Sequence, residues 1–350
     1  MLKDKKSNRK AAHSAALLYR NLLLLFYFLI STSFFVLVIY LSSSPSLPSI
    51  KRPLMLYSNQ CNDPIKTVYL KAIKEAKSSL FLIIYGLTDR DVIRALQSKQ
   101  AEGVNLRIFF DPVGSKGIEQ DFPEGVAFPT KSRGLMHKKI LVVDHKQIFT
   151  GSANLTDTSL RLHDNLVLGC YDKGLAHFLE SSLDSSYCLQ IDNQEIEFWS
   201  LPEQEQKALS RLLEEIDKAK KSIKICMFTF THRKIYQSLL DAKTRGVDIS
   251  IAIDYYSSRG ASKNMISNLY KQGITPYIGA PGKLLHNKWC LIDEDTLICG
   301  STNWTHSAFT KNDDSLIFLP RLSKKKANYI KNIWKQTEYT STIYSENAIN

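Results

Sequence analysis

The sequence predicts an α/β protein in which two similar α/β/α halves pack about a pseudo-twofold axis, preceded by one N-terminal hydrophobic helix. Three observations lead to this fold: an internal repeat, a polar motif that occurs twice, and an apolar segment near the start of the chain. The repeat aligns residues 76–111 with residues 219–254 at a constant spacing of 143. Because self-similarity at one spacing is typical of a duplicated unit, we expect the two halves to share one fold.

Each half reads as helix, strand, helix, strand and then a hairpin that carries the motif. In the first half, hydrophobic periodicity predicts helices over 66–77 and 91–101 and strands over 80–85 and 106–110. The expected domain boundaries follow from this pattern. They are a first half over 60–191, a linker over 192–206, a second half over 207–340 and a C-terminal tail over 341–350.

The apolar segment over 22–41 is twenty uncharged residues long, which is about the length a helix needs to cross a bilayer. A basic stretch precedes it, so we expect residues 1–21 to form a cytoplasmic tail and the segment to be a transmembrane signal-anchor. A linker over 42–59 would then lead to an extracytoplasmic catalytic body. The alternative is a cleaved signal peptide, which would leave a secreted protein.

Composition indicates a globular body and an anionic partner. The chain has 350 residues, of which 44% are hydrophobic, and a formal net charge of +12. Such a charge favours an anionic phospholipid membrane, a nucleic acid or a phosphate-bearing substrate as partner. The six cysteines include no Cys-x-x-Cys pair, so we expect neither a metal site nor another cofactor. If the body is exported, a bridge between Cys61 and Cys188 is a further hypothesis.

The repeated motif is His-x-Lys-x-x-x-x-Asp followed by Gly-Ser-x-Asn. Side chains two apart on a strand share a face, so each histidine and lysine are presented together, and the hairpin returns the Ser and Asn to them. Each motif aspartate falls at the hairpin turn, where we expect it to hold the hairpin through ion pairs. The first copy consists of His137, Lys139, Asp144, Ser152 and Asn154, and the second of His286, Lys288, Asp293, Ser301 and Asn303.

Two facing copies of this motif suit phosphoryl transfer. One histidine can attack phosphorus while the other protonates the leaving oxygen. The lysines and the neutral donors can neutralise the phosphoryl oxygens as charge develops, without a metal. Because both copies are on one chain, a second chain is not needed to complete the site.

The duplicated motif resembles the signature of the phospholipase D superfamily, and the chain is similar to its compact, bacterial-type members over roughly residues 60–340. The resemblance implies a phosphohistidine intermediate, with His137 as nucleophile and His286 as general acid and then base, or the reverse. It implies that Lys139, Lys288, Asn154 and Asn303 bind phosphate, with Ser152 and Ser301 in support. A further acid commonly follows each motif, and Asp164 and Asp314 are the candidates for orienting the imidazoles.

The resemblance leaves the substrate open, because the superfamily includes phospholipases, phosphatidyltransferases and nucleases. The membrane anchor favours a phospholipid phosphodiester, either hydrolysed or transferred. A membrane-tethered or secreted nuclease is the alternative. Transfer of the cardiolipin-synthase type is less expected, because one hydrophobic span is visible where two are usual. An inactive phosphate- or lipid-binding module is a further alternative, against which the intact histidines and lysines argue.

Overall fold

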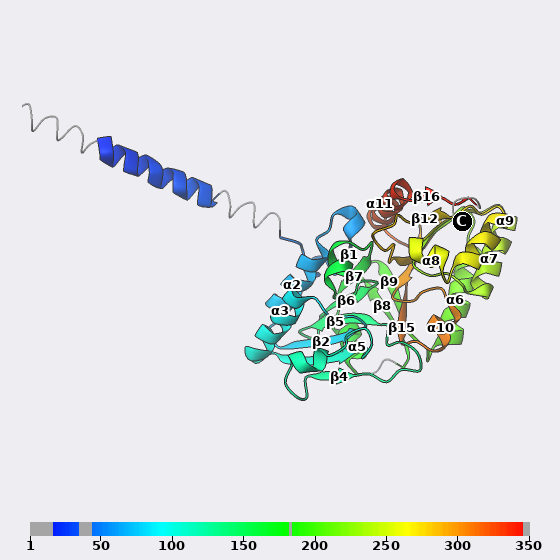
Figure 1. The fold of residues 1–350 in the computed structure, drawn as a ribbon, viewed down its shortest axis with the longest axis horizontal. Coiled ribbons are helices and arrows are strands. Elements are labelled where there is room, and N and C mark those ends of the chain that lie inside the picture. Colours follow the sequence, from blue (N-terminus) through cyan, green and yellow to red (C-terminus); the bar gives the residue numbers. More distant parts are fainter. Residues whose placement is uncertain (1–16, 35–43, 182–183, 346–350) are drawn as a thin grey trace, which may run out of the picture. The chain divides into compact units, whose positions relative to one another are not determined.

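The computed structural model describes residues 17–34, 44–181 and 184–345, and it separates into a unit over 1–46 and a unit over 47–350. The first unit contains an exposed helix, Leu17–Phe34, with a mean hydropathy of 1.5 (Figure 1). By length and composition this helix can span a membrane. The rest of the expected segment over 22–41 and most of the basic tail lie outside the described residues.

The first half of the second unit contains a seven-stranded sheet in the order β1-β7-β6-β5-β2-β3-β4. β2 and β3 are parallel, as expected for strands joined by a crossover helix, whereas β5, β6 and β7 are antiparallel neighbours. The strands are β1 (Leu54–Ser58), β2 (Ser79–Ile84), β3 (Asn105–Phe110), β4 (Ala127–Pro129), β5 (Lys139–Val143), β6 (Gln147–Gly151) and β7 (Leu166–Tyr171). The helices are η1 (Asn59–Cys61), α2 (Ile65–Glu75), α3 (Arg90–Ala101), η2 (Ile118–Asp121), α4 (Asp157–Arg161) and α5 (Lys173–Ser181).

The second half repeats this plan in a nine-stranded sheet in the order β16-β12-β11-β10-β13-β14-β15-β9-β8. Its strands are β8 (Ser186–Ile191), β9 (Gln194–Leu201), β10 (Ser222–Met227), β11 (Asp248–Ile253), β12 (Tyr277–Ile278), β13 (Lys288–Ile292), β14 (Thr296–Gly300), β15 (Asp314–Leu319) and β16 (Thr342–Ile343). Its helices are α6 (Glu205–Lys218), α7 (Arg233–Thr244), α8 (Tyr255–Arg259), α9 (Lys263–Lys271), α10 (His306–Thr310) and α11 (Lys324–Thr340).

Three hydrophobic clusters hold these layers together. One lies between the first sheet and α2 and α3, and another lies between the second sheet and α6, α7 and α9. These helices lie on opposite flanks of the body (Figure 1). The third cluster joins the two sheets and includes α5 and α11. Within β5, Leu141 belongs to the cluster between the first sheet and α2 and α3. Ile140 and Val142 belong to the cluster that joins the two sheets, so this strand is apolar on both faces.

The α/β fold with two similar halves is confirmed, but each half begins earlier than we expected. The segment over 192–206 is not a plain linker, because it holds β9, which pairs with β15, and the start of α6. The expected linker over 42–59 likewise holds β1, which pairs with β7, and the expected tail over 341–350 holds β16. These strands lie outside the aligned repeat, so the repeat could not reveal them.

All six cysteines are free thiols, so the hypothesised bridge between Cys61 and Cys188 is not formed. Cys170, Cys226, Cys290 and Cys299 lie in strands and are buried, where they pack as small apolar side chains.

Candidate active site

The two motif hairpins meet where the halves join. The main chain next to each motif is bonded to the opposite half: His137 N donates to Asp313 O (2.8 Å), and Asp164 N donates to Leu284 O (2.9 Å). Both motif histidines are buried, with 7% of His137 and 6% of His286 exposed. Lys288 lowers the pKa of His137, and Lys139 lowers that of His286, after the larger effect of burial. The two copies therefore build one electrostatically connected site.

His137 is held by a carboxylate of the opposite half. Its Nδ1 lies 2.8 Å from Asp314 Oδ1. Burial raises the pKa of Asp314, but His137, Lys139 and a hydrogen bond from Ser301 outweigh it and leave that pKa below its usual range. An ionised Asp314 only accepts hydrogen bonds, so His137 carries its hydrogen on Nδ1 and keeps the Nε2 lone pair free.

His286 is held by an amide, and here our expectation for Asp164 was wrong. Asn165 Oδ1 lies 3.0 Å from His286 Nδ1, and Asp164 instead forms an ion pair with Lys283 at 2.8 Å. Asn165 Nδ2 donates to the carbonyl of Ser159 (2.8 Å), which fixes the oxygen toward the imidazole. Asn165 matches Asp314 at the spacing of the motif histidines, a signal in the sequence that identifies the correct residue.

Ser152 and Ser301 are buried and their hydroxyls are bonded within the protein, which differs from the predicted supporting role in binding phosphate. Ser301 Oγ donates to Asp314 Oδ1 (2.6 Å), and Ser152 Oγ donates to Asn165 Oδ1 (2.9 Å). Each hydroxyl also accepts a backbone N–H from the strand that follows, and both serines are buried. They are positioning residues, since they hold the groups that orient the imidazoles.

The side chains of both motif lysines are buried. Burial lowers the pKa of Lys139 to about 7 and that of Lys288 well below its ordinary value, where Lys139 adds to the effect. Each ammonium donates to the carbonyl of its own motif histidine. Lys139 also lies 5.1 Å from the ring centre of Tyr85, and Lys288 lies 5.0 Å from that of Phe228. An anionic phosphodiester would favour the charged form of both lysines.

Asn154 and Asn303 end the two motif copies, and each amide can donate hydrogen bonds through its Nδ2. Both are half-buried, and the buried Oδ1 of each has no hydrogen-bond partner. Gly151 and Gly300 bring them there, because each has a positive φ (150° and 143°). A Cβ on Gly151 would lie 2.2 Å from the carbonyl oxygen of Leu166 in the neighbouring strand β7, so only glycine fits at this position.

The motif aspartates hold the hairpins, but through backbone amides rather than the ion pairs we expected. Asp144 accepts N–H bonds from Lys77, Ser78 and Ser79, each between 2.7 and 3.2 Å. Asp293 does the same in the second half, with the amides of Lys220, Lys221 and Ser222 as donors. They are therefore structural parts of the motif and do not touch the reacting centre.

Two carboxylates that we did not assign to the site also position it. Asp111 Oδ2 accepts from Met136 N, and Asp254 Oδ2 accepts from Leu285 N, both at 3.0 Å. Met136 and Leu285 immediately precede the motif histidines. Asp111 and Asp254 are an identical pair in the internal repeat, which is the signal that could have identified them.

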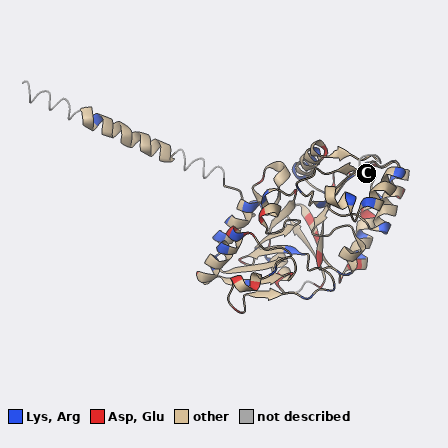
Figure 2. Cartoon of the chain, in the orientation of Figure 1, with Lys and Arg blue, Asp and Glu red and all other residues tan. Residues whose placement is uncertain are grey.

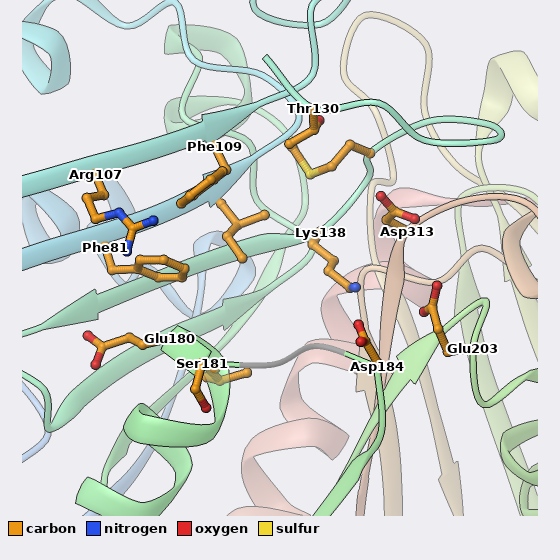
Figure 3. Close-up of a pocket in the computed structure, with 13 residues that line it drawn as sticks. Phe81, Arg107, Phe109, Thr130, Lys138, Glu180, Ser181, Asp184, Glu203 and Asp313 are labelled. Carbon is orange, nitrogen blue, oxygen red and sulfur yellow. The ribbon is translucent and has the colours of Figure 1, made fainter. Parts of the chain in front are cut away.

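Lys138, between the two motif residues of the first copy, points away from the site. It enters a cavity of about 380 Å³ whose polar end includes Asp184, Glu203 and Asp313 and whose apolar wall includes Phe81 (Figure 3). Burial lowers its pKa. Within the part of the chain that the structure describes, no three His, Cys, Asp or Glu side chains cluster as a metal site would require.

The family model "Cardiolipin synthase, PLD-like domain" matches residues 69–187 and 212–334, which include both motif copies. The chain belongs to the phospholipase D superfamily. Its superfamily relatives include the mitochondrial cardiolipin hydrolase of Danio rerio, 29% identical over 138 residues, which are 38% of this chain and 60% of that protein. The phospholipase D of Rickettsia prowazekii is 27% identical over 191 residues, 50% of this chain and 89% of that protein.

A solved structure with the same phospholipase D fold is the phosphatidylserine synthase of Haemophilus influenzae. It has a TM-score of 0.68 and 10% identity, and the match covers 85% of this chain and 89% of that one. At this identity the likeness establishes the fold alone. The chain spans 53 to 60% of the length of the cardiolipin hydrolases of Mus musculus and Danio rerio that it matches.

Proposed function

We propose that this chain is a phosphodiesterase that cleaves a phospholipid phosphodiester through a phosphohistidine, by hydrolysis or by transfer to an alcohol. The observation that carries the proposal is that the two motif histidines have different hydrogen-bond partners at Nδ1. His137 contacts the carboxylate of Asp314, whereas His286 contacts the neutral amide of Asn165. This difference favours one order of roles over the other.

His137 is the proposed nucleophile. When its Nε2 bonds to phosphorus while Nδ1 keeps its hydrogen, the ring acquires positive charge. The carboxylate of Asp314 stabilises that charge in a buried site, where Coulomb interactions are strong. Asn165 offers His286 no comparable charge, so a phosphohistidine there would be less stable.

His286 is the proposed general acid. A protonated imidazole beside a neutral amide gives up its proton more readily than one beside a carboxylate. Burial and Lys288 depress the pKa of His286 in the free protein, and the anionic phosphodiester offsets the nearby positive charges when it binds. The proton on Nε2 then passes to the leaving oxygen as the P–O bond breaks.

The second step restores both histidines. A water molecule, or an alcohol in the transfer reaction, gives its proton to His286 and attacks phosphorus, and the P–N bond to His137 breaks. The products are the free alcohol from the first step and a phosphatidate or a new phosphodiester. The chain's own residues carry out each proton transfer, so the proposed reaction needs no metal ion.

The choice of a lipid substrate rests on the apolar helix Leu17–Phe34 and on the names of the relatives, a phospholipase D and cardiolipin hydrolases. We propose that this helix is a membrane anchor with the basic N-terminus in the cytoplasm and the catalytic body on the other side. A nuclease is the second candidate. The net charge of +12 favours it, and Lys and Arg lie on the outer helices of both halves (Figure 2).

The test uses the full chain in maltoside micelles with excess EDTA and a phospholipid that carries p-nitrophenol as its alcohol. This leaving group departs without a proton, so His286→Ala can complete the first step but lacks the base for the second. We expect this variant to release one equivalent of nitrophenol and to accumulate an acid-labile phosphoryl group on His137. His137→Ala should give neither.

Three results would count against parts of the proposal. A phosphoryl group trapped on His286 would reverse the two roles. Activity that disappears in EDTA and returns with a divalent metal would exclude the metal-independent reaction. In a parallel assay with natural phosphatidylcholine, cardiolipin and a labelled single-stranded oligonucleotide, cleavage of the oligonucleotide alone would assign the protein to the nuclease branch.

A further inference from the structure

The internal duplication reveals a second charged site, at the N-terminus of α7 in the second half. In the first half the equivalent place is a closed ion cluster. Lys66 Nζ lies 2.7 Å from carboxylate oxygens of both Asp89 and Asp91 and 3.5 Å from Asp157. Asp89 also caps α3, since it accepts the N–H groups of Asp91 and Val92. The first-half cluster is therefore satisfied without a ligand.

In the second half all four positions differ in charge. At the repeat spacing, Leu209 replaces Lys66, His232 replaces Asp89 and Lys234 replaces Asp91, and His306 replaces Asp157 at the spacing of the motif histidines. Three carboxylates have become two histidines and a lysine, and the central cation has become apolar. The twelve-residue helix α7 consequently begins without any side-chain cap. Its first N–H groups and its positive dipole end favour an anion.

The burial of His232 and its unpartnered ring nitrogen indicate a ligand. Only 5% of this residue is exposed, and its buried Nδ1 has no hydrogen-bond partner. A buried imidazole nitrogen without a partner is costly, and an acceptor that reaches the ring would remove that cost. Burial, with His306 and Lys234, lowers the pKa of His232 to about 4, so the ring is neutral at pH 7.

These groups line one cavity of about 390 Å³. Arg233, Lys234 and His306 are exposed at its rim, and Glu205 of α6 is the single carboxylate among its lining residues. The N–H groups of Thr231 and His232 donate to the carbonyl of Trp304. Trp304 immediately follows Asn303, so the cavity is connected through one peptide unit to the catalytic loop.

We propose that this cavity binds a phosphate group, separately from the catalytic centre. The ligand accepts hydrogen bonds from the first turn of α7 and from His232, while Arg233 and Lys234 neutralise its charge. A phosphate group can be free inorganic phosphate or the headgroup of an anionic lipid, and both present the same oxygens. The proposal does not depend on which reaction the catalytic centre performs.

The test follows the imidazole signals of the full chain, labelled at histidine, in maltoside micelles by NMR. The His232 signal is assigned by its loss in His232→Gln. We expect inorganic phosphate to shift it saturably, and sodium chloride of equal ionic strength to leave it in place. Lys234→Asp restores the first-half residue and should weaken phosphate binding about 10-fold or more, because a charge-assisted hydrogen bond is replaced by repulsion. Lys271→Asp, the same change at an exposed site on α9, should have no effect.

The source of the phosphate is separated in nanodiscs without free phosphate. A His232 shift in discs that contain phosphatidic acid, but not in pure phosphatidylcholine discs, would assign the site to a lipid headgroup. A shift with inorganic phosphate alone would assign it to the free anion. The proposal is overturned if neither probe shifts His232, or if chloride does so equally. It is also overturned if Lys234→Asp and a second variant, His306→Asp, bind phosphate as the wild type does while keeping its unfolding temperature.

Discussion

The Nδ1 of His137 lies 2.8 Å from Oδ1 of Asp314, a residue of the opposite half of the chain. The equivalent contact in the other direction joins His286 to Asn165. The two half-sites are thus nearly symmetric in geometry but differ by one charge. This single difference distinguishes the histidines chemically, although their motifs have the same pattern.

Exchanging the carboxylate and the amide should alter the two histidines in opposite ways. Asp314→Asn removes the charge that stabilises a phosphohistidine on His137, so we expect kcat to fall at least about 100-fold. Asn165→Asp places a carboxylate beside His286 and raises the pKa of its imidazole. The acid then stays protonated to higher pH, and the alkaline limb of the kcat/KM profile should move upward.

The pH profile of each variant, measured with the lipid substrate in micelles, checks this pair. Asp164→Asn is the matched control, because Asp164 contacts Lys283 and not an imidazole. An unchanged alkaline limb in Asn165→Asp, or a profile that moves equally in Asp164→Asn, would contradict the assignment of His286 as the acid.

The buried ammonium of Lys139 should cost stability. Burial holds the pKa of Lys139 at about 7 in the folded chain, against an ordinary value of 10.5, so the unfolded chain binds more protons between these values. Stability from this group therefore rises as pH increases from 7 to about 10. Lys139→Met removes the charge, and at pH 7 we expect it to raise the free energy of unfolding by about 1 to 4 kcal/mol while activity is lost.

Thermal unfolding of the full chain in micelles from pH 6 to 10 measures this effect. The advantage of Lys139→Met over the wild type should be largest near pH 6 and shrink toward pH 10. An advantage that stays constant with pH would mean that the gain comes from packing rather than from the buried charge. A variant less stable than the wild type at every pH would contradict the prediction outright.

Gly151 should tolerate a side chain less well than Gly103, although both have a positive φ. A Cβ on Gly103 has no atom within 4 Å, whereas one on Gly151 would lie 2.2 Å from the carbonyl oxygen of Leu166. Gly103→Ala should therefore cost about 1 to 2 kcal/mol from backbone strain alone. Gly151→Ala should cost more, by about 1 to 3 kcal/mol, because β7 must move away from β6.

Chemical denaturation of the two variants compares these costs directly. Movement of β7 also displaces Asn165, which immediately precedes that strand, so Gly151→Ala should lose activity even where it remains folded. Equal destabilisation of both variants would show that β6 and β7 are less closely packed at Gly151 and Leu166 than the structure indicates.

Much of this protein follows from its sequence alone. The presence of an apolar helix near the N-terminus and the duplicated halves follow from local periodicity and spacing, although the described helix begins at Leu17 rather than at residue 22 and His137 precedes β5. Two-residue alternation on a strand and the length of an uncharged run are properties of the covalent chain, whatever it packs against. The repeat also contained a signal for Asp111 and Asp254 that we did not use.

The packing of one half against the other decided the rest. Asp164 and Asn165 are neighbours immediately before β7. The spacing of the motif histidines pairs Asn165 with Asp314, but the meeting of the two halves is what places Asn165 against His286 and Asp164 against Lys283. Ser152 and Ser301 carry hydroxyl groups of the kind that bind phosphate. In the folded hairpins, however, the hydroxyl of Ser152 donates to Asn165 and that of Ser301 donates to Asp314. Sequence patterns determine which groups share a strand face, whereas contacts between elements far apart in the chain depend on how the folded layers meet.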